Sequence, residues 1–173
     1  ARRACRPGER SFGGITFSSP QQQLIESLLQ KACEQEPELD AWFAPNNLDY
    51  CFVKNLETVQ GDERDEICFS ICFGPRSNGV VSMDFGALNK PGGERRLNVA
   101  ITRARCALHV FASFQPEKID RSRTNARAVH HLQEFLMFCR EQQKQADRPL
   151  RSQDFDGDLQ RQIHDLLVGE GYL

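Results

Sequence analysis

The chain has 173 residues, of which 39% are hydrophobic, so it is long enough for one α/β domain with a full core and part of another. Its 22 Lys and Arg residues against 24 Asp and Glu residues give a formal net charge of -2, which excludes binding to nucleic acid through bulk positive charge. The most apolar stretch, residues 67–73, is too short to span a bilayer, and the N-terminal residues lack the apolar core of a signal peptide. We therefore predict a cytoplasmic protein with no membrane partner and only local sites for anions.

The first half of the chain predicts a parallel strand-helix-strand unit. FGGITF at 12–17 is a short β-like stretch, and the Ser-Ser-Pro that follows begins a helix whose apolar stripe at 24–29 must lie on a sheet. The charged stretch from 34 to 47 ends this helix, and YCFVKNL at 50–56 is the next expected strand. Elements in this order predict a parallel crossover.

The second half of the domain predicts two more strands and a helix. A polar turn at 59–66 leads into residues 67–73, which are typical of a central strand buried on both faces. The Gly-rich stretch from 74 to 93 predicts a long loop with one short strand around 80–83. A helix with apolar positions at Leu97, Ala100, Ile101 and Ala104 then leads to a strand at 107–113. The core domain is expected to finish near Ser113.

Two further amphipathic segments follow this core. The first predicts a helix from about Thr124 to Gln145 that docks on the domain. Residues 147–149 are typical of a linker, and 150–173 predict a helix whose apolar stripe has nothing to pack against. We therefore predict one domain at 1–145, followed at 146–173 by a linker and the start of a truncated domain.

The seven cysteines include no C-x-x-C pair. Buried free thiols in a reducing cytosol explain them better than disulfides or zinc, because five lie inside apolar segments: Cys51, Cys68, Cys72, Cys106 and Cys139. The spacings of the histidines match no zinc pattern either. The sequence therefore predicts no metal site.

Two segments carry most of the candidate chemistry. GERRLNVAITRAR at 93–105 predicts a closely packed helix that projects guanidinium groups from one end, with Arg96 and Arg103 on one face, as binding to phosphates requires. The alternative is that these arginines pair with acids of the same domain. In ETVQGDERDE at 57–66, Gly61 permits close approach of a ligand, Gln60 can donate and accept hydrogen bonds, and Glu63 can accept from a sugar hydroxyl. An ordinary polar loop is the alternative there.

In order and spacing, three segments resemble motifs of the second RecA-like lobe of superfamily 1 helicases, the Upf1-like branch in particular. ITFSSPQQQLIESLL at 15–29 is similar to motif IV, VQGDERDEICFSI at 59–71 to motif V, and RRLNVAITRAR at 95–105 to motif VI. The resemblance extends to large bacterial helicase-related proteins with a C-terminal Vsr-like endonuclease domain, whose first helix is similar to residues 151–173. It implies an α/β fold, with a RecA-like, P-loop NTPase-type parallel sheet flanked by helices.

The resemblance also implies roles for single residues. Arg103 matches the family's arginine finger, which reaches the γ-phosphate of ATP bound mainly to the first lobe. The remaining matches are Gln21, Gln60, Gly61, Glu63 and Arg96 on the nucleotide side, and Thr58 and Asn98 on the nucleic-acid side. If the three motifs act together, we expect Gln21, the 60–63 turn and Arg103 to converge on one open edge of the sheet.

The sequence contains no G-x-x-x-x-G-K-[ST] phosphate loop and no Walker B segment after a buried strand. We therefore expect a piece of a longer polypeptide that holds half of an ATPase site and is inactive alone. The expected function is the second motor lobe of an ATP-dependent helicase or translocase. ATP and Mg²⁺ would bind only in the complete parent, and the partners would be the missing first lobe and DNA, or alternatively RNA. A non-catalytic RecA-like scaffold or nucleic-acid interaction module is the main alternative, and a nuclease fragment is another.

Overall fold

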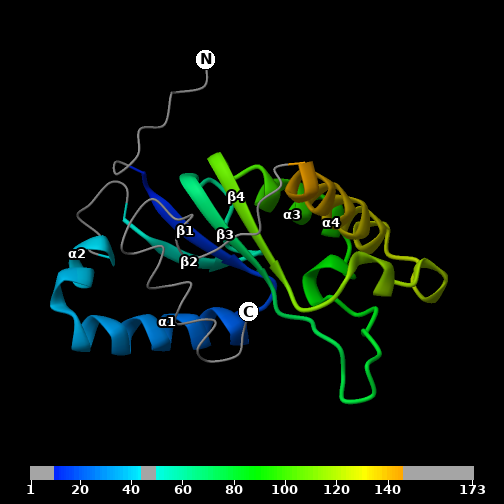
Figure 1. The fold of residues 1–173 in the computed structure, drawn as a ribbon, viewed down its shortest axis with the longest axis horizontal. Coiled ribbons are helices and arrows are strands. Elements are labelled where there is room, and N and C mark those ends of the chain that lie inside the picture. Colours follow the sequence, from blue (N-terminus) through cyan, green and yellow to red (C-terminus); the bar gives the residue numbers. More distant parts are fainter. Residues whose placement is uncertain (1–9, 44–49, 146–173) are drawn as a thin grey trace.

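The computed structural model describes residues 10–43 and 50–145. Its centre is a four-stranded sheet in which every neighbouring pair is parallel and the strand order is β2-β1-β3-β4 (Figure 1). The strands are β1 (Phe12–Thr16), β2 (Phe52–Asn55), β3 (Arg64–Ile71) and β4 (Ala104–Ala112). Helix α1 (Ser19–Gln35) covers one face, and α3 (Gly93–Ile101) and α4 (Arg127–Gln145) cover the other (Figure 1). The predicted α/β fold with a parallel sheet flanked by helices is confirmed, and it is consistent with a RecA-like lobe.

Shorter helical segments complete the connections. They are η1 (Pro37–Leu39), α2 (Asp40–Phe43), η2 (Gly86–Leu88), η3 (Pro116–Lys118) and η4 (Arg121–Arg123). No helix among the described residues is both long and apolar enough to cross a membrane.

Helix α1 begins where the sequence predicts. The Ser18 side chain accepts a hydrogen bond from the backbone N–H of Gln21, and a proline occupies the first turn. On the buried stripe, Ile25 and Leu29 pack against Phe12 of β1 and other apolar side chains of the sheet. Together with the parallel pairing of β1 and β2, this confirms the predicted crossover.

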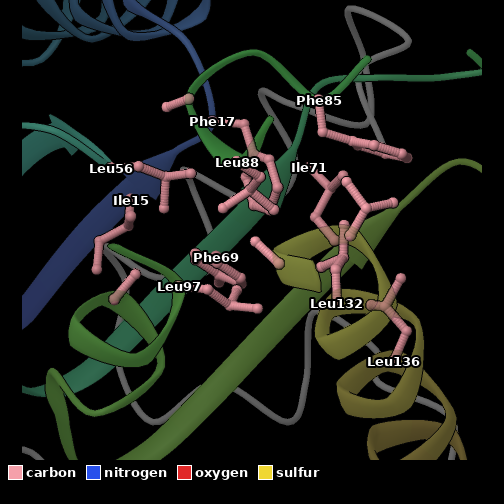
Figure 2. Close-up of a cluster of buried hydrophobic side chains, with 14 of the residues drawn as sticks. Ile15, Phe17, Leu56, Phe69, Ile71, Phe85, Leu88, Leu97, Leu132 and Leu136 are labelled. Carbon is pink, nitrogen blue, oxygen red and sulfur yellow. The ribbon is translucent and has the colours of Figure 1, made fainter. Parts of the chain in front are cut away.

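Strand β3 is buried on both faces, as its apolar run predicts. Ile67, Phe69 and Ile71 point into the larger core under α3 and α4, whereas Cys68 belongs to the smaller core under α1. Figure 2 shows Phe69 and Ile71 surrounded by apolar side chains of those helices and of the loop before α3. Fully burying one such side chain stabilises the fold by about 1.5 to 3 kcal/mol, so these cores fix the strand positions.

The connection from β2 to β3 crosses the sheet on the side of the larger core. Leu56 and Val59 are buried there together with Ile15 of β1. In the strand register, Asn55 at the end of β2 lies opposite Thr16, whereas Arg64 at the start of β3 lies opposite Ala104. Residues 56–63 therefore run from the carboxyl edge of the sheet to its amino edge.

Several predicted boundaries differ from the structure. The expected strand at 80–83 is one isolated antiparallel bridge, between Pro75 and Val81. Helix α3 ends at Ile101, so Ala104 is the first residue of β4 rather than a helical position. Strand β3 begins at Arg64, so the acidic residues that follow lie in the strand and not in a turn before it. The predicted docking helix is α4, which packs against α3. The predicted segment 146–173 lies outside the described residues, so its boundary stays a prediction.

Among the cysteines in the described residues, all but Cys106 are free thiols, as predicted. Cys51 and Cys68 are buried free thiols, and Cys33, Cys72 and Cys139 are partly buried free thiols. Burial raises the pKa of Cys51 to about 12 and that of Cys139 to about 11. Cys106 departs from the prediction because it is exposed on the edge strand β4 and disulfide-bonded.

Candidate functional site

The predicted site residues lie at two opposite edges of the sheet. All strands are parallel, so their carboxyl ends share one edge and their amino ends share the other. Arg103 and Glu63 directly precede β4 and β3 at the amino edge, whereas Gln21 and Thr58 follow β1 and β2 at the carboxyl edge. The convergence expected for the three motifs is therefore wrong for Gln21. The reason is that motif IV follows its strand, while the Gln60–Glu63 turn and Arg103 come before theirs.

Arg103 is held in place at the amino edge. Its backbone oxygen accepts a hydrogen bond of 3.1 Å from the N–H of Arg64, which aligns the starts of β3 and β4. Its Nε donates to the carbonyl oxygen of Val99 at 2.8 Å, and its NH2 donates to the Thr102 hydroxyl at 3.1 Å. No carboxylate among the described residues forms an ion pair with it. The end of α3 thus orients this guanidinium without neutralising its charge.

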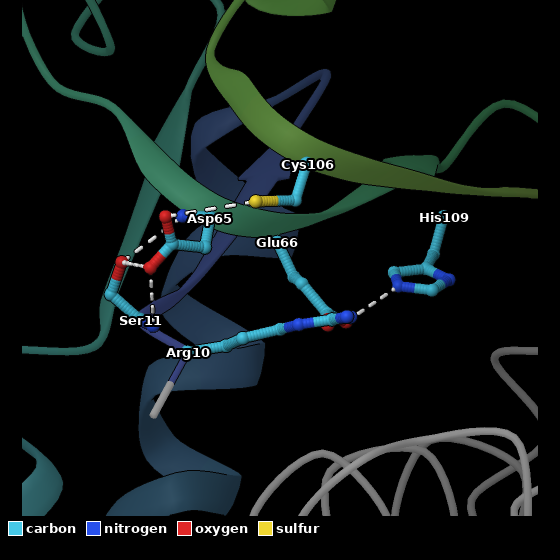
Figure 3. Close-up of polar contacts among 6 residues, drawn as sticks. All are labelled: Arg10, Ser11, Asp65, Glu66, Cys106 and His109. Carbon is cyan, nitrogen blue, oxygen red and sulfur yellow. Dashed lines mark hydrogen bonds and ion pairs between the residues drawn. The ribbon is translucent and has the colours of Figure 1, made fainter. Parts of the chain in front are cut away.

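Arg105, two residues further on, is neutralised by acids. Its Nε lies 3.0 Å from Asp65 Oδ1, and its NH1 lies 3.7 Å from Glu63 Oε1. Ser11 donates to Asp65 Oδ2 through both its backbone N–H and its hydroxyl, each at 2.9 Å (Figure 3). Burial raises the pKa of Asp65, but the Ser11 hydrogen bonds and the charge of Arg105 outweigh it, and the pKa lies below its usual value. Arg105 therefore ties Glu63 to β4.

A buried carboxylate completes the amino edge. Glu66 is only 2% exposed, and its two oxygens contact His109 Nε2 at 2.9 Å and the Arg10 guanidinium (Figure 3). Burial raises the pKa of Glu66, but the hydrogen bonds from His109 and Arg10 outweigh it and lower the pKa overall. Glu66 was not among the residues predicted from the sequence, because the polar run at 59–66 was expected to be a turn. Glu66 directly precedes the apolar run at 67–73, and this position was the signal in the sequence that it could lie in the buried strand.

The turn that contains Gln60 and Gly61 is exposed. Gly61 has a φ of +90, and a Cβ built there would meet no atom within 4 Å. Glycine is required for this backbone conformation, and the space beside it is open. Asp62 Oδ2 lies 2.6 Å from Lys54 Nζ, which fastens the turn to β2. The turn can therefore present Gln60 and Glu63 to a ligand from a fixed backbone.

Neutral side chains dominate the carboxyl edge. Gln21 Nε2 donates to the Ser70 hydroxyl at 2.8 Å, and the Thr58 hydroxyl accepts from the backbone N–H of Asn55 at 3.1 Å. The Asn55 amide in turn donates to Ser19 Oγ at 3.2 Å and to Gln22 Oε1 at 2.8 Å. These bonds join the start of α1 to the turn that carries Thr58.

Helix α3 separates its arginines instead of gathering them at one end. Arg96 is in the first two turns, where its NH1 donates to the carbonyl oxygens of Pro91 at 2.8 Å and Ala87 at 3.4 Å. Arg103 follows the other end of the helix, about 10 Å away along the axis at 1.5 Å per residue. The expected cluster at one end is therefore wrong, and Arg96 fastens the preceding loop. The Asn98 side chain is exposed, and the backbone carbonyl oxygen of Asn98 accepts a hydrogen bond from the Thr102 hydroxyl.

Within the described residues, no group of three or more His, Cys, Asp or Glu side chains is placed to hold a metal ion. The amino edge is a charged surface with an oriented guanidinium, that of Arg103, which no carboxylate of the described residues compensates. Such a group can bind an oxyanion supplied from outside the chain.

This chain belongs to the AAA domain family (AAA_12), whose sequence pattern matches residues 3–115. It is 37% identical over 135 residues to an uncharacterized ATP-dependent helicase, MG140, from Mycoplasma genitalium. The identity to the MG140 homolog of Mycoplasma pneumoniae is also 37% over 135 residues. Each alignment covers 76% of this chain and 12% of the relative, so the chain spans about an eighth of the length of these proteins.

Proposed function

We propose that this chain is the second motor lobe of an ATP-dependent nucleic-acid helicase or translocase. The AAA domain family and the similarity to proteins named as ATP-dependent helicases support this assignment. The chain would act with a first lobe of the same polypeptide, which would bind ATP and Mg²⁺.

The state of Arg103 carries the proposal. Its guanidinium is oriented by Val99 and Thr102, yet no acid among the described residues neutralises it. In phosphoryl transfer, negative charge spreads over the oxygens of the γ-phosphate, and an arginine placed there raises the rate by about three to five orders of magnitude. When the two lobes close, Arg103 would supply that charge to ATP on the first lobe.

The residues around Arg103 take supporting roles in this proposal. Gln60, Gly61 and Glu63 would face the nucleotide from the same edge, and Arg105 would keep Glu63 at a constant distance from β4. Arg96 would act indirectly by fastening the loop before α3. We do not place Gln21 at the nucleotide, because it lies at the opposite edge of the sheet.

The carboxyl edge would hold the nucleic acid. Thr58 and the start of α1 lie there together, and neutral amides and hydroxyls bind a strand through its backbone without reading bases. Repeated closing and opening of the two lobes would move that strand. DNA is the proposed substrate, with RNA as the alternative. We do not place Asn98 among the residues that contact the nucleic acid, because it lies towards the end of α3 that is at the amino edge.

The test uses the complete parent enzyme with Arg103→Ala. We expect kcat for ATP to fall by about three orders of magnitude while nucleotide affinity stays nearly constant, because the group acts on the transition state. Arg103→Lys should be almost as poor, since an ammonium cannot replace the planar guanidinium. Arg76→Ala, which removes an exposed arginine from the loop after β3, is the matched control. An unchanged kcat in both Arg103 variants would contradict the proposal.

A non-catalytic scaffold is the competing function. In a scaffold, motif VI arginines would pair with acids of the same domain, as Arg105 does with Asp65. Arg103 has no such partner among the described residues, and this observation favours the motor lobe.

A further inference from the structure

An open hollow of about 630 Å³ lies between the start of α3 and the start of α4. Six residues line it: Pro91, Gly92, Glu94, Arg95, Arg127 and His131. The two helices begin in close contact, because a Cβ built on Gly93 would lie 3.0 Å from Ala128 Cβ and 2.1 Å from the Leu88 carbonyl oxygen. Glycine at this position therefore lets side chains far apart in the sequence share one hollow.

The hollow carries an excess of positive charge. Arg95 and Arg127 are exposed, and neither guanidinium forms an ion pair with any described residue. Two other arginines, one in η4 and one on α4, are neutralised, since Arg121 pairs with Glu134 and Arg140 pairs with Glu117. Glu94 is the one carboxylate among the lining residues, so the two arginines outnumber it. In a chain with a net charge of -2, this is a local site for an anion.

The hollow also adjoins the carboxyl edge. Lys90 precedes the lining residue Pro91 in the sequence, and its Nζ lies 3.6 Å from Glu57 Oε1. Glu57 in turn directly precedes Thr58. Arg96 NH1 donates to the Pro91 carbonyl oxygen at 2.8 Å and so fixes the rim. A strand that passes Thr58 would therefore lie beside Arg95 and Arg127, whose guanidinium groups form no ion pair with a described residue.

We propose that this hollow binds a backbone phosphate of the nucleic-acid strand through Arg95 and Arg127, with His131 beside them. Guanidinium groups pair with phosphate oxygens through parallel hydrogen bonds. A contact of this kind positions the strand and reads no sequence. The inference rests on the proposed function, because it extends the path of the strand from Thr58 to the start of α3.

The test measures binding of a fluorescein-labelled oligo(dT) to the 173-residue chain by fluorescence anisotropy at several salt concentrations. Each phosphate neutralised on a single strand contributes about 0.7 to the slope of log Kobs against log salt, so Arg95→Ala/Arg127→Ala, which removes the contacts to one phosphate, should lower that slope by about 0.7. The control, Lys31→Ala/Lys118→Ala, removes two exposed charges elsewhere and should leave the slope unchanged. Thermal melting of both variants verifies that they are folded.

Three results would overturn the inference. Equal weakening by the two double variants would mean that bulk charge alone attracts the strand. An unchanged slope, or no binding by the wild-type chain at low salt, would mean that no strand phosphate enters the hollow. Displacement of the oligonucleotide by micromolar inorganic phosphate at constant ionic strength would assign the hollow to free phosphate instead.

A failure of the proposed phosphate site in the hollow can be distinguished from a failure of the proposed motor lobe. In the parent enzyme, Arg95→Ala/Arg127→Ala should leave the ATPase rate without nucleic acid unchanged, whereas Arg103→Ala should lower it by about three orders of magnitude. Loss of strand binding with normal basal ATPase supports the hollow, and loss of basal ATPase in the double variant contradicts it.

Discussion

The two edges of the sheet are built from different chemistry. At the amino edge, Arg105 and Glu66 connect ionisable side chains of β3 and β4 with Glu63 before β3 and Arg10 before β1. At the carboxyl edge, Gln21 and Asn55 join neutral amides and hydroxyls through hydrogen bonds. A charged edge responds to the charge of a ligand, whereas a neutral edge mainly fixes geometry. The difference is the one that our proposal assigns to a nucleotide side and a nucleic-acid side.

Two neighbouring arginines at the amino edge, Arg103 and Arg105, also differ in the chemistry of their partners. The charge of Arg105 is neutralised by ion pairs with Glu63 and Asp65, whereas Arg103 has only neutral hydrogen-bond partners among the described residues. One arginine stabilises the fold, and the other keeps its charge for a ligand. Measurements of the free energy of unfolding of variants of this chain can test this difference.

The largest effect on stability is expected from Glu66. We expect Glu66→Ala to lower the free energy of unfolding by about 3 kcal/mol, because it leaves Arg10 and the largely buried His109 without their carboxylate. Urea unfolding followed by circular dichroism measures this. The control is Glu57→Ala, which breaks the exposed pair with Lys90 and should cost less than about 1 kcal/mol. Equal costs for the two variants would mean that the amino edge is no more tightly built than the surface.

The contribution of Glu66 should disappear in acid. Its pKa is lowered from the ordinary value of 4.5, because the contacts with His109 and Arg10 outweigh burial. A carboxyl group with a lowered pKa stabilises the fold above its unfolded-state pKa, and this stabilisation is lost as the pH falls through the folded-state pKa. The wild-type chain should therefore lose stability below pH 4.5 more steeply than Glu66→Ala. A gap between the two that stays constant into acid would contradict this assignment.

The sequence predicted the fold well because the fold follows from local patterns. The N-cap before α1, the apolar stripe of α4 and the continuous apolar run of β3 each specify an element without reference to the rest of the chain. The strand predicted at 80–83 in the Gly-rich segment was wrong, because the structure has only a single bridge there, between Pro75 and Val81, and such a bridge leaves no periodic pattern in the sequence.

The site was predicted less completely, because its residues are paired across distant parts of the chain. Motif resemblance selected Arg103, Glu63 and Gln21 as candidates, but it did not show that Gln21 lies at the opposite edge of the sheet from the other two. That edge depends on whether a motif precedes or follows its strand. The Glu66 and His109 pair depends on the β3 and β4 register, and the hollow at Arg95 depends on the packing of α3 against α4.

A smaller effect is expected at the carboxyl edge. Asn55→Ala removes the amide hydrogen bonds to Ser19 and Gln22, and Asn55 itself is 6% exposed. We expect a loss of about 1 to 2 kcal/mol in the free energy of unfolding. Asn98→Ala, on the exposed face of α3, is the matched control and should change it by less than about 0.5 kcal/mol. If both variants behave alike, the hydrogen bonds of Asn55 do not hold the two loops together.

The smallest effect is expected from Arg103, and it makes the sharpest contrast with Arg105. Arg103→Ala removes hydrogen bonds only to the end of its own helix, and no acid among the described residues is left unpaired, so the free energy of unfolding should change by less than about 0.5 kcal/mol. Arg105→Ala leaves Glu63 and Asp65 without their cation and should cost about 1 kcal/mol, because both pairs are partly exposed. Urea unfolding of the two variants at low ionic strength compares them directly, and added salt should narrow the difference by screening the pairs of Arg105. A larger cost for Arg103 than for Arg105 would make Arg103 a structural residue, and the oriented charge at the amino edge would then need no ligand to explain it.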